Sequence, residues 1–155
     1  TLDGGRPFDE AAAELSETFP AYADLISAWG ERFGETITDP VPGMHAIVEE
    51  LDARNVPLFA TTNFSADFWR PFRAREDAFF SRFRDNVVSG EEKLLKPDPA
   101  IYFRALDRFG LKPAEALFVD DRAINVEGAR AVGMQAHLFT TAEDLRTRLE
   151  ADGLL

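Results

Sequence analysis

The chain has 155 residues, of which 45% are hydrophobic and 29% charged, proportions that are typical of one globular domain and exclude a disordered segment. Lys and Arg number 17 against 28 Asp and Glu, and the resulting net charge of −11 disfavours binding to nucleic acid or to anionic membrane surfaces. The chain has no cysteine and no apolar run of the ~18 residues that a membrane span needs. We therefore expect a cytoplasmic protein whose partners are small molecules.

The N-terminal part of the chain predicts a helical hairpin. Apolar residues recur at helical spacing over residues 8–19 and again over residues 21–33. The prolines and glycine of residues 39–43 then forbid regular structure and indicate a boundary. We expect a helical unit over residues 1–38 and a second unit over residues 39–155.

Beyond this boundary, short apolar runs alternate with segments of helical periodicity. The runs that predict strands are residues 56–62, 87–88, 116–119 and 136–139, and the predicted helices are residues 44–54, 66–72, 100–109, 124–131 and 142–150. Right-handed crossover connections make such strands parallel. The pattern therefore predicts an α/β fold, with an open parallel sheet covered by helices on both faces.

Polar residues end or follow three of the predicted strands. They are Thr61, Thr62 and Asn63 after the first strand, Ser89 after the second, and Asp120 and Asp121 after the third. Ligands of open α/β sheets bind at the carboxyl ends of the strands. We therefore expect these side chains to converge on one edge of the sheet.

The adjacent carboxylates of Asp120 and Asp121 predict a cation site. Like charges this close raise each other's pKa unless a cation lies between them, and oxygen donors suit Mg²⁺. The alternative is that one aspartate caps the helix that follows. Lys96, in a proline-rich loop, either balances this charge and contacts a phosphoryl oxygen or is an ordinary surface lysine. Thr62 and Asn63 either donate hydrogen bonds to an anion or begin a turn.

Other candidate residues have simpler interpretations. His137 lies in an apolar run, as a hydrogen-bonded core residue does, and His45 begins a helix with its side chain expected to face solvent. The arginines and phenylalanines of residues 70–84 indicate a solvated helix face over an aromatic core. Phe64 and Trp69 could line an entrance between the two units.

Three segments, taken in order, resemble motifs of the haloacid dehalogenase-like (HAD) hydrolases that carry a helical cap after their first strand. Residues 56–63 resemble the second motif of the family, residues 96–102 the third, and residues 117–134 the fourth. Each motif is weak alone, whereas all three in order at fitting separations are specific. The resemblance implies a Rossmann-like (HAD-like) parallel sheet with a partial helical cap.

The resemblance also implies roles for the matching residues. Thr62 and Lys96 would take part in catalysis and, with Asn63, bind the phosphoryl group. Asp121 would bind Mg²⁺ directly, and Asp120 would act through water or as a partner of the metal ligands. The paired aspartates favour a Mg²⁺-dependent phosphatase of a small phosphorylated metabolite over a 2-haloacid dehalogenase, because family members of the latter type need no metal.

The first motif of the family, an apolar strand ending in Asp-x-Asp, has no counterpart in these residues. Its first aspartate is the nucleophile that forms an aspartyl-phosphate, and its second is a general acid/base. Asp3 follows no apolar strand, so we interpret it as a solvated terminal residue. We expect a truncation or a mis-called start within the cap, and no activity for the chain as given. The alternative is a non-catalytic phosphate-binding, metabolite-binding or interaction protein derived from the family.

The resemblance finally implies that two strands lack a neighbour. In the family the first strand lies between the strands that correspond to residues 56–62 and 116–120. Each unmade buried backbone hydrogen bond costs about 1–3 kcal/mol. We therefore expect the chain to associate with itself or to capture a strand through these edges.

Overall fold

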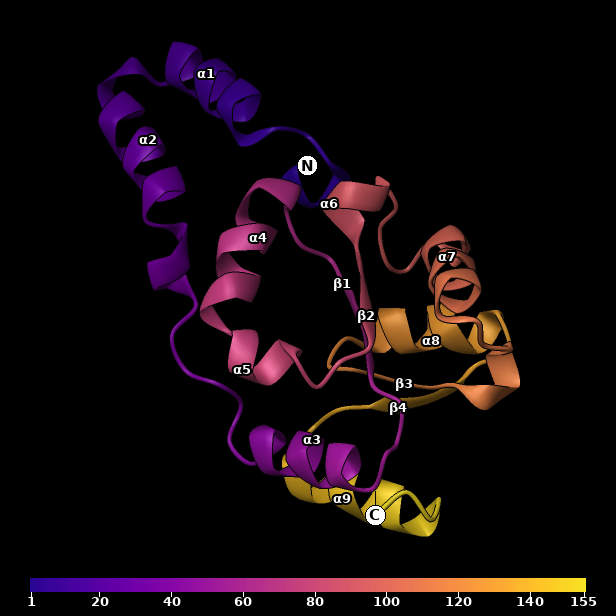
Figure 1. Cartoon of the computed structure of the whole chain (residues 1–155). Coiled ribbons are helices and arrows are strands. Elements are labelled where there is room, and N and C mark those ends of the chain that lie inside the picture. The colour runs from indigo at the N-terminus through magenta and orange to yellow at the C-terminus, as the bar shows by residue number, and fades with distance from the viewer.

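The computed structural model describes residues 1–155 and begins with a helical hairpin. Its N-terminal elements are η1 (Leu2–Gly4), α1 (Phe8–Thr18), η2 (Pro20–Tyr22), α2 (Ala23–Glu31) and η3 (Phe33–Thr36). Helices α1 and α2 pack against each other and stand away from the rest of the molecule (Figure 1). No residue before Met44 is buried, and Leu25 remains 67% exposed. The predicted hairpin is therefore present, with one apolar face open.

Residues 44–155 form the layered part of the molecule. Its elements are α3 (Met44–Ala53), β1 (Phe59–Thr62), α4 (Ala66–Arg75), α5 (Asp77–Phe80), β2 (Asp85–Val88), α6 (Ser89–Glu92), α7 (Pro99–Phe109), η4 (Pro113–Glu115), β3 (Leu117–Asp120), α8 (Ala123–Ala131), β4 (Gln135–Leu138) and α9 (Ala142–Ala151). All four predicted strands and all five predicted helices are found, whereas the short helices α5 and α6 were not predicted. Strand β1 begins at Phe59, after the start of its apolar run at Val56. The Val56 N–H instead donates to the Leu51 carbonyl at the end of helix α3, and Pro57 has no N–H to donate.

The strands do not form one continuous sheet. Strand β1 pairs with β2, and β3 pairs with β4, and both pairs are parallel as predicted. Strands β1 and β3 are not paired with each other, so the structure holds two separate sheets of two strands. The predicted α/β fold with parallel strands is therefore confirmed, whereas the single continuous sheet expected from the alternation of strands and helices is not formed. Each of the two strands has one open edge, as the family resemblance implied.

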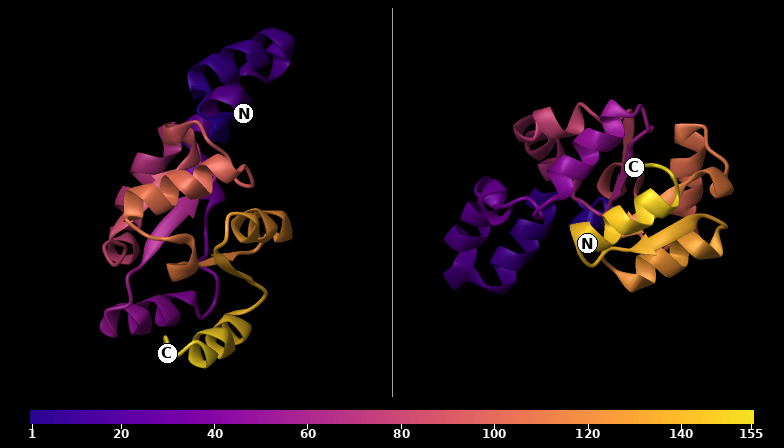
Figure 2. Two further views of the ribbon diagram at one scale, coloured as in Figure 1. Left: turned by 90° about the vertical axis from the view of Figure 1, so that its right-hand side faces the viewer. Right: turned by 90° about the horizontal axis from the view of Figure 1, so that it is seen from below.

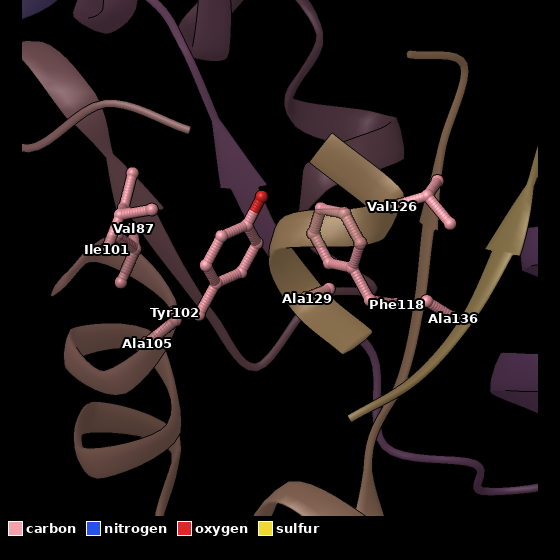
Figure 3. Packing of buried hydrophobic residues seen from close by; sticks show 8 residues of the cluster. All are labelled: Val87, Ile101, Tyr102, Ala105, Phe118, Val126, Ala129 and Ala136. Carbon is pink, nitrogen blue, oxygen red and sulfur yellow. The ribbon is translucent and has the colours of Figure 1, made fainter. Parts of the chain in front are cut away.

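Helices α7 and α8 join the two sheets on one face. A buried cluster combines residues of both helices with residues of β2, β3 and β4: Val87, Ile101, Tyr102, Ala105, Phe118, Val126, Ala129 and Ala136 (Figure 3). Within it the rings of Tyr102 and Phe118 meet edge to face at 5.4 Å. Helices α3 and α9 lie side by side below the sheets and form a second cluster (Figure 1, Figure 2). None of the helices is both long and apolar enough to span a bilayer.

A cavity of about 720 Å³ separates the two sheets, and we call it the trough. Its lining is mostly apolar and includes Leu58, just before β1, Phe59 at the start of β1, and Leu117 and Val119 from β3. The whole chain exposes 9263 Å², whereas a compact monomer of this mass exposes roughly 7,800 Å². The open trough and the projecting hairpin account for this excess.

Candidate functional site

Lys96 connects the two sheets at the carboxyl ends of their strands. Its ammonium donates to the backbone oxygen of Thr61 at the end of β1 (2.8 Å) and to Oδ2 of Asp120 at the end of β3 (2.7 Å). The side chains of Lys96 and Asp120 are 9% and 6% exposed. A buried charge pair of this kind needs further hydrogen bonds to offset its lost hydration. The interpretation of Lys96 as an ordinary surface lysine is wrong.

Asn63 holds the backbone of Lys96 from the other direction. The Lys96 N–H donates to Asn63 Oδ1 (2.9 Å), and Asn63 Nδ2 donates to the Lys96 carbonyl (3.0 Å). We call Thr61, Asn63, Lys96 and Asp120 the rim cluster. The structure thus brings together side chains that lie far apart in the sequence, as the strand-end rule predicts.

The second carboxylate oxygen of Asp120 also accepts hydrogen bonds. Its Oδ1 accepts from the backbone N–H of Arg122 and from Asn125 Nδ2, each at 2.9 Å. Burial on its own would raise the pKa of Asp120, but the hydrogen bonds from Lys96, Arg122 and Asn125 together hold the pKa below its usual value. The Lys96 ammonium thus supplies positive charge beside this carboxylate, while the Mg²⁺ site expected at Asp120 and Asp121 stays a prediction.

Tyr102 and Gly128 support the rim cluster from below, and sequence reasoning missed both. The Tyr102 hydroxyl donates to the backbone oxygen of Asn125 (2.8 Å), and burial together with the nearby Asp120 charge raises the pKa of Tyr102 to about 12. A Cβ on Gly128 would lie 2.8 Å from the carbonyl oxygen of Pro97. Glycine therefore lets helix α8 approach the loop that carries Lys96.

The oxygen donors at the end of β3 fit a hard cation such as Mg²⁺ in type and fall short in number. Asp121 is exposed, and the side-chain oxygen of Asn125 is buried without a hydrogen-bond partner. No group of three or more His, Cys, Asp or Glu side chains is close enough to hold a metal. Mg²⁺ commonly keeps several waters and takes substrate phosphate oxygens. The chain supplies part of such a ligand set.

Thr62 and Ser89 occupy different kinds of position at the strand ends. Thr62 is half-buried as the last residue of β1. Ser89 is fully buried, and its hydroxyl accepts from the Phe64 N–H (2.9 Å) and donates to the Asp3 carbonyl (2.6 Å). The side chain of Ser89 therefore fastens η1 to the end of β1, while Asp3 itself is exposed.

One interpretation of an aromatic residue needs correction. Trp69 is 4% exposed and packs within the core, so it lines no entrance, whereas the Phe64 ring contacts Phe33 at the base of the hairpin at 5.7 Å. His45 is exposed, as expected, and its ring also stacks on that of Phe79 at 4.7 Å. His137 Nε2 lies 3.1 Å from an Asp144 carboxylate oxygen, a contact between β4 and α9.

Comparison with known proteins gives matches over most of the chain. Residues 3–133 match the family model of the haloacid dehalogenase-like hydrolases. A phosphoserine phosphatase of Thermus thermophilus is 33% identical over 135 residues, which is 86% of this chain and 48% of that protein. Flavin mononucleotide hydrolase 1 of Arabidopsis thaliana is 28% identical over 115 residues, which is 72% of this chain and 45% of that protein. The chain spans about half the length of these relatives.

The fold is also that of solved structures. A HAD family enzyme from Bacteroides thetaiotaomicron superimposes with a TM-score of 0.72 at 19% identity, covering 96% of this chain and 74% of that chain. A variant of the same enzyme, in complex with magnesium and inorganic phosphate, gives a TM-score of 0.67 at 18% identity over 90% of this chain and 73% of that chain. The chain belongs to the haloacid dehalogenase-like hydrolases.

Proposed function

We propose that residues 39–155 supply the phosphate-binding and charge-balancing side of a phosphatase that acts on a small phosphorylated metabolite. The observation that carries this proposal is the buried contact of Lys96 with both Thr61 and Asp120, which places a fixed positive charge at the carboxyl edge of both sheets. Fixed charges of this kind stabilise a transferring phosphoryl group. The names of the two relatives and the phosphate bound by the Bacteroides enzyme support the same reaction class.

The residues at and beside the rim cluster have distinct parts in the proposed reaction. The hydroxyl of Thr62 and the backbone N–H of Asn63 donate hydrogen bonds to the phosphoryl oxygens. Lys96 offsets the repulsion between the phosphoryl group and an attacking carboxylate, which displaces the alcohol of the phosphate ester and forms an aspartyl-phosphate. Water then attacks the phosphorus, which releases inorganic phosphate and restores the carboxylate. When bound through Asp121, with Asp120 and Asn125 beside it, Mg²⁺ supplies further positive charge to the phosphoryl oxygens. The hairpin of residues 1–38 serves as part of a cap that limits access of water.

The attacking carboxylate must come from outside the rim cluster. Asp120 is unsuited to this task because its oxygens already accept three hydrogen bonds. We propose Asp121 as a ligand of Mg²⁺, so it is not available as the nucleophile. We therefore propose that an aspartate on an additional segment provides the nucleophile.

The trough is the place that we propose for this segment. Strands β1 and β3 border it with open edges, and its walls are apolar, so it suits one extended segment with small or apolar side chains. Such a strand would gain backbone hydrogen bonds on both sides and would end at the rim cluster. Without it, we propose that two copies of the chain pair through the same edges.

Restoration of activity tests the proposed reaction. We expect the 155-residue chain to release no phosphate from p-nitrophenyl phosphate with Mg²⁺ above background. A protein extended by an apolar strand ending in Asp-x-Asp should release phosphate, and Lys96→Ala should abolish the gain. Release of halide from a 2-haloacid by the extended protein without metal, together with no phosphatase activity, would contradict the proposal.

Sedimentation tests the proposed use of the trough. The chain alone should sediment as a dimer or larger species, and a peptide with the sequence of the added strand should convert it to a monomeric complex. Amide exchange in Leu58–Ala60 and Leu117–Val119 should be slower in this complex than in the chain alone at a concentration low enough to separate the copies, because the peptide gives these N–H groups partners. A monomer that is already strongly protected in both segments without peptide would show that the edges are paired in another way.

A further inference from the structure

We propose that Asn63 is a positioning residue, whose side chain sets the place of the Lys96 ammonium and so acts on the phosphoryl group through Lys96. This inference rests on the proposed phosphatase function for its effect on catalysis. It assigns the side-chain amide of Asn63 a task that differs from direct binding of phosphate.

Both polar atoms of the Asn63 side chain are directed at one residue. Oδ1 accepts from the Lys96 N–H at 2.9 Å, and Nδ2 donates to the Lys96 carbonyl at 3.0 Å. These two hydrogen bonds have the same reciprocal pattern as the hydrogen bonds between two backbone segments in a sheet. The side chain of Asn63 is thus committed to the backbone of a residue 33 positions later.

Fixing the Lys96 backbone matters because the lysine side chain is long and flexible. Four rotatable bonds separate its backbone from the ammonium, and these bonds allow many positions of the charge. The ammonium occupies one position, between Thr61 and Asp120, which belong to different sheets. Helix α8 limits the loop on its other side, where Gly128 contacts Pro97. The Asn63 side chain therefore fixes the loop that carries Lys96 to the end of β1.

The effect on catalysis follows from where the charge is needed. The ammonium must lie beside the phosphoryl oxygens as the attacking carboxylate approaches them, and a misplaced ammonium lowers kcat more than it weakens ground-state binding. An asparagine that touched the phosphoryl group itself would contribute to ground-state binding as well, and its removal would raise KM. The two roles therefore predict different kinetic changes.

The first test measures the reactivity of the Lys96 amine and needs no catalytic activity. The other lysines of the chain, Lys93 and Lys112, are exposed and serve as internal references. Acylation with a small reagent, followed by mass spectrometry, should label Lys96 about tenfold more slowly than the references in the unaltered chain. Asn63→Ala should bring the rate for Lys96 to within about threefold of the references. Asn63→Asp, which keeps an acceptor for the Lys96 N–H, should give an intermediate rate.

The second test uses the extended, active protein. Asn63→Ala should lower kcat about tenfold while KM changes less than about twofold, and Asn63→Asp should recover part of the loss. Faster labelling of Lys96 in a protein that hydrolyses no phosphate ester would support the positioning role and reject the proposed function. Unchanged labelling of Lys96 in both folded variants, with a raised KM in Asn63→Ala, would overturn the positioning role.

Discussion

The rim cluster and the trough lie on the same strands, yet they differ in how many of their polar groups have hydrogen-bond partners. At the rim, the Asp120 carboxylate accepts three hydrogen bonds and the Asn63 side chain makes two. In the trough, the edges of β1 and β3 border an apolar cavity, with no strand between them. The comparison shows that the geometry around Lys96 does not need a continuous sheet, because side chains cross from one sheet to the other.

The helices explain how both conditions coexist in one chain. The buried cluster around Tyr102 ties β2 to β3 and β4 through α7 and α8, so the two sheets keep their relative position although β1 and β3 do not pair (Figure 3). Lys96 lies in the loop between α6 and α7, and it contacts β1 at the end of the trough where the rim cluster lies. Substitutions in the rim cluster should therefore affect both the contact between the two sheets and the proposed reaction.

Removing the Lys96 ammonium should have the largest effect on stability. Lys96→Met leaves the Asp120 charge buried without its partner, which costs about 3–5 kcal/mol of the free energy of unfolding. Urea unfolding followed by circular dichroism measures this loss. The matched variant Lys112→Met changes an exposed lysine and should cost less than about 0.5 kcal/mol. Equal losses in the two variants would contradict a special role for the pair.

A methyl group at Gly128 should have the next largest effect. The added Cβ would lie 2.8 Å from the Pro97 carbonyl and 2.9 Å from the Tyr102 hydroxyl. Such crowding should destabilise Gly128→Ala by about 1–3 kcal/mol in the same unfolding experiment. Gly34→Ala is the control, because its Cβ would meet only Arg75 Nη1, at 3.4 Å. A neutral Gly128→Ala would show that the Lys96 loop can shift without cost.

Acid should weaken the rim cluster before it affects the trough. The hydrogen bonds to Asp120 keep its pKa in the folded chain below the value of about 3.9 expected in the unfolded chain. The stability from this carboxylate is therefore complete above that value and is lost as the pH falls toward the folded pKa. Unfolding measured from pH 6 to pH 2 should show this loss in the unaltered chain and in Asp121→Asn. It should be smaller in Asp120→Asn, where Glu50, Asp85 and Glu92 still contribute because their arginine partners also lower their pKa values, and an unchanged acid profile in that variant would contradict the assignment.

The smallest expected effect concerns the connection of the hairpin. Arg75 donates to the backbone oxygens of Gly34 (2.6 Å) and Ile37 (3.1 Å), and all three residues lie outside the buried clusters. Arg75→Gln should change the global free energy of unfolding by less than about 0.5 kcal/mol. Proteolysis between residues 34 and 43 should nevertheless become faster. A large global loss would show that the hairpin stabilises the sheets directly.

The strand ends were predictable from the sequence, whereas the joining of the sheets was not. Apolar runs followed by Thr62 or Asp120 indicate where strands stop, and the rule for open sheets brings these ends together. The same runs indicate that β1 and β3 are buried, but they do not indicate whether the two strands are neighbours in a sheet. The side-chain contacts of Asn63 have no periodic signal, because they reach a backbone group 33 residues away. Trp69 was misplaced because an aromatic residue near a site looks the same in sequence whether it faces a cavity or the core.

The two attachments of the hairpin to helix α4 restrict how the hairpin can move. On one side of the hairpin the Phe8 N–H donates to Asp67 (2.7 Å), and on the other side Arg75 holds the segment that leaves η3. Ser89 adds a third attachment outside α4, at the Asp3 carbonyl, and attachments at three places oppose rotation of the hairpin as a whole. Phe68 lies between the two α4 attachments in the sequence, and its ring stacks on Phe33 at 4.2 Å. The hairpin should therefore keep one resting angle relative to α4, and the size of the side chain at residue 68 should set that angle.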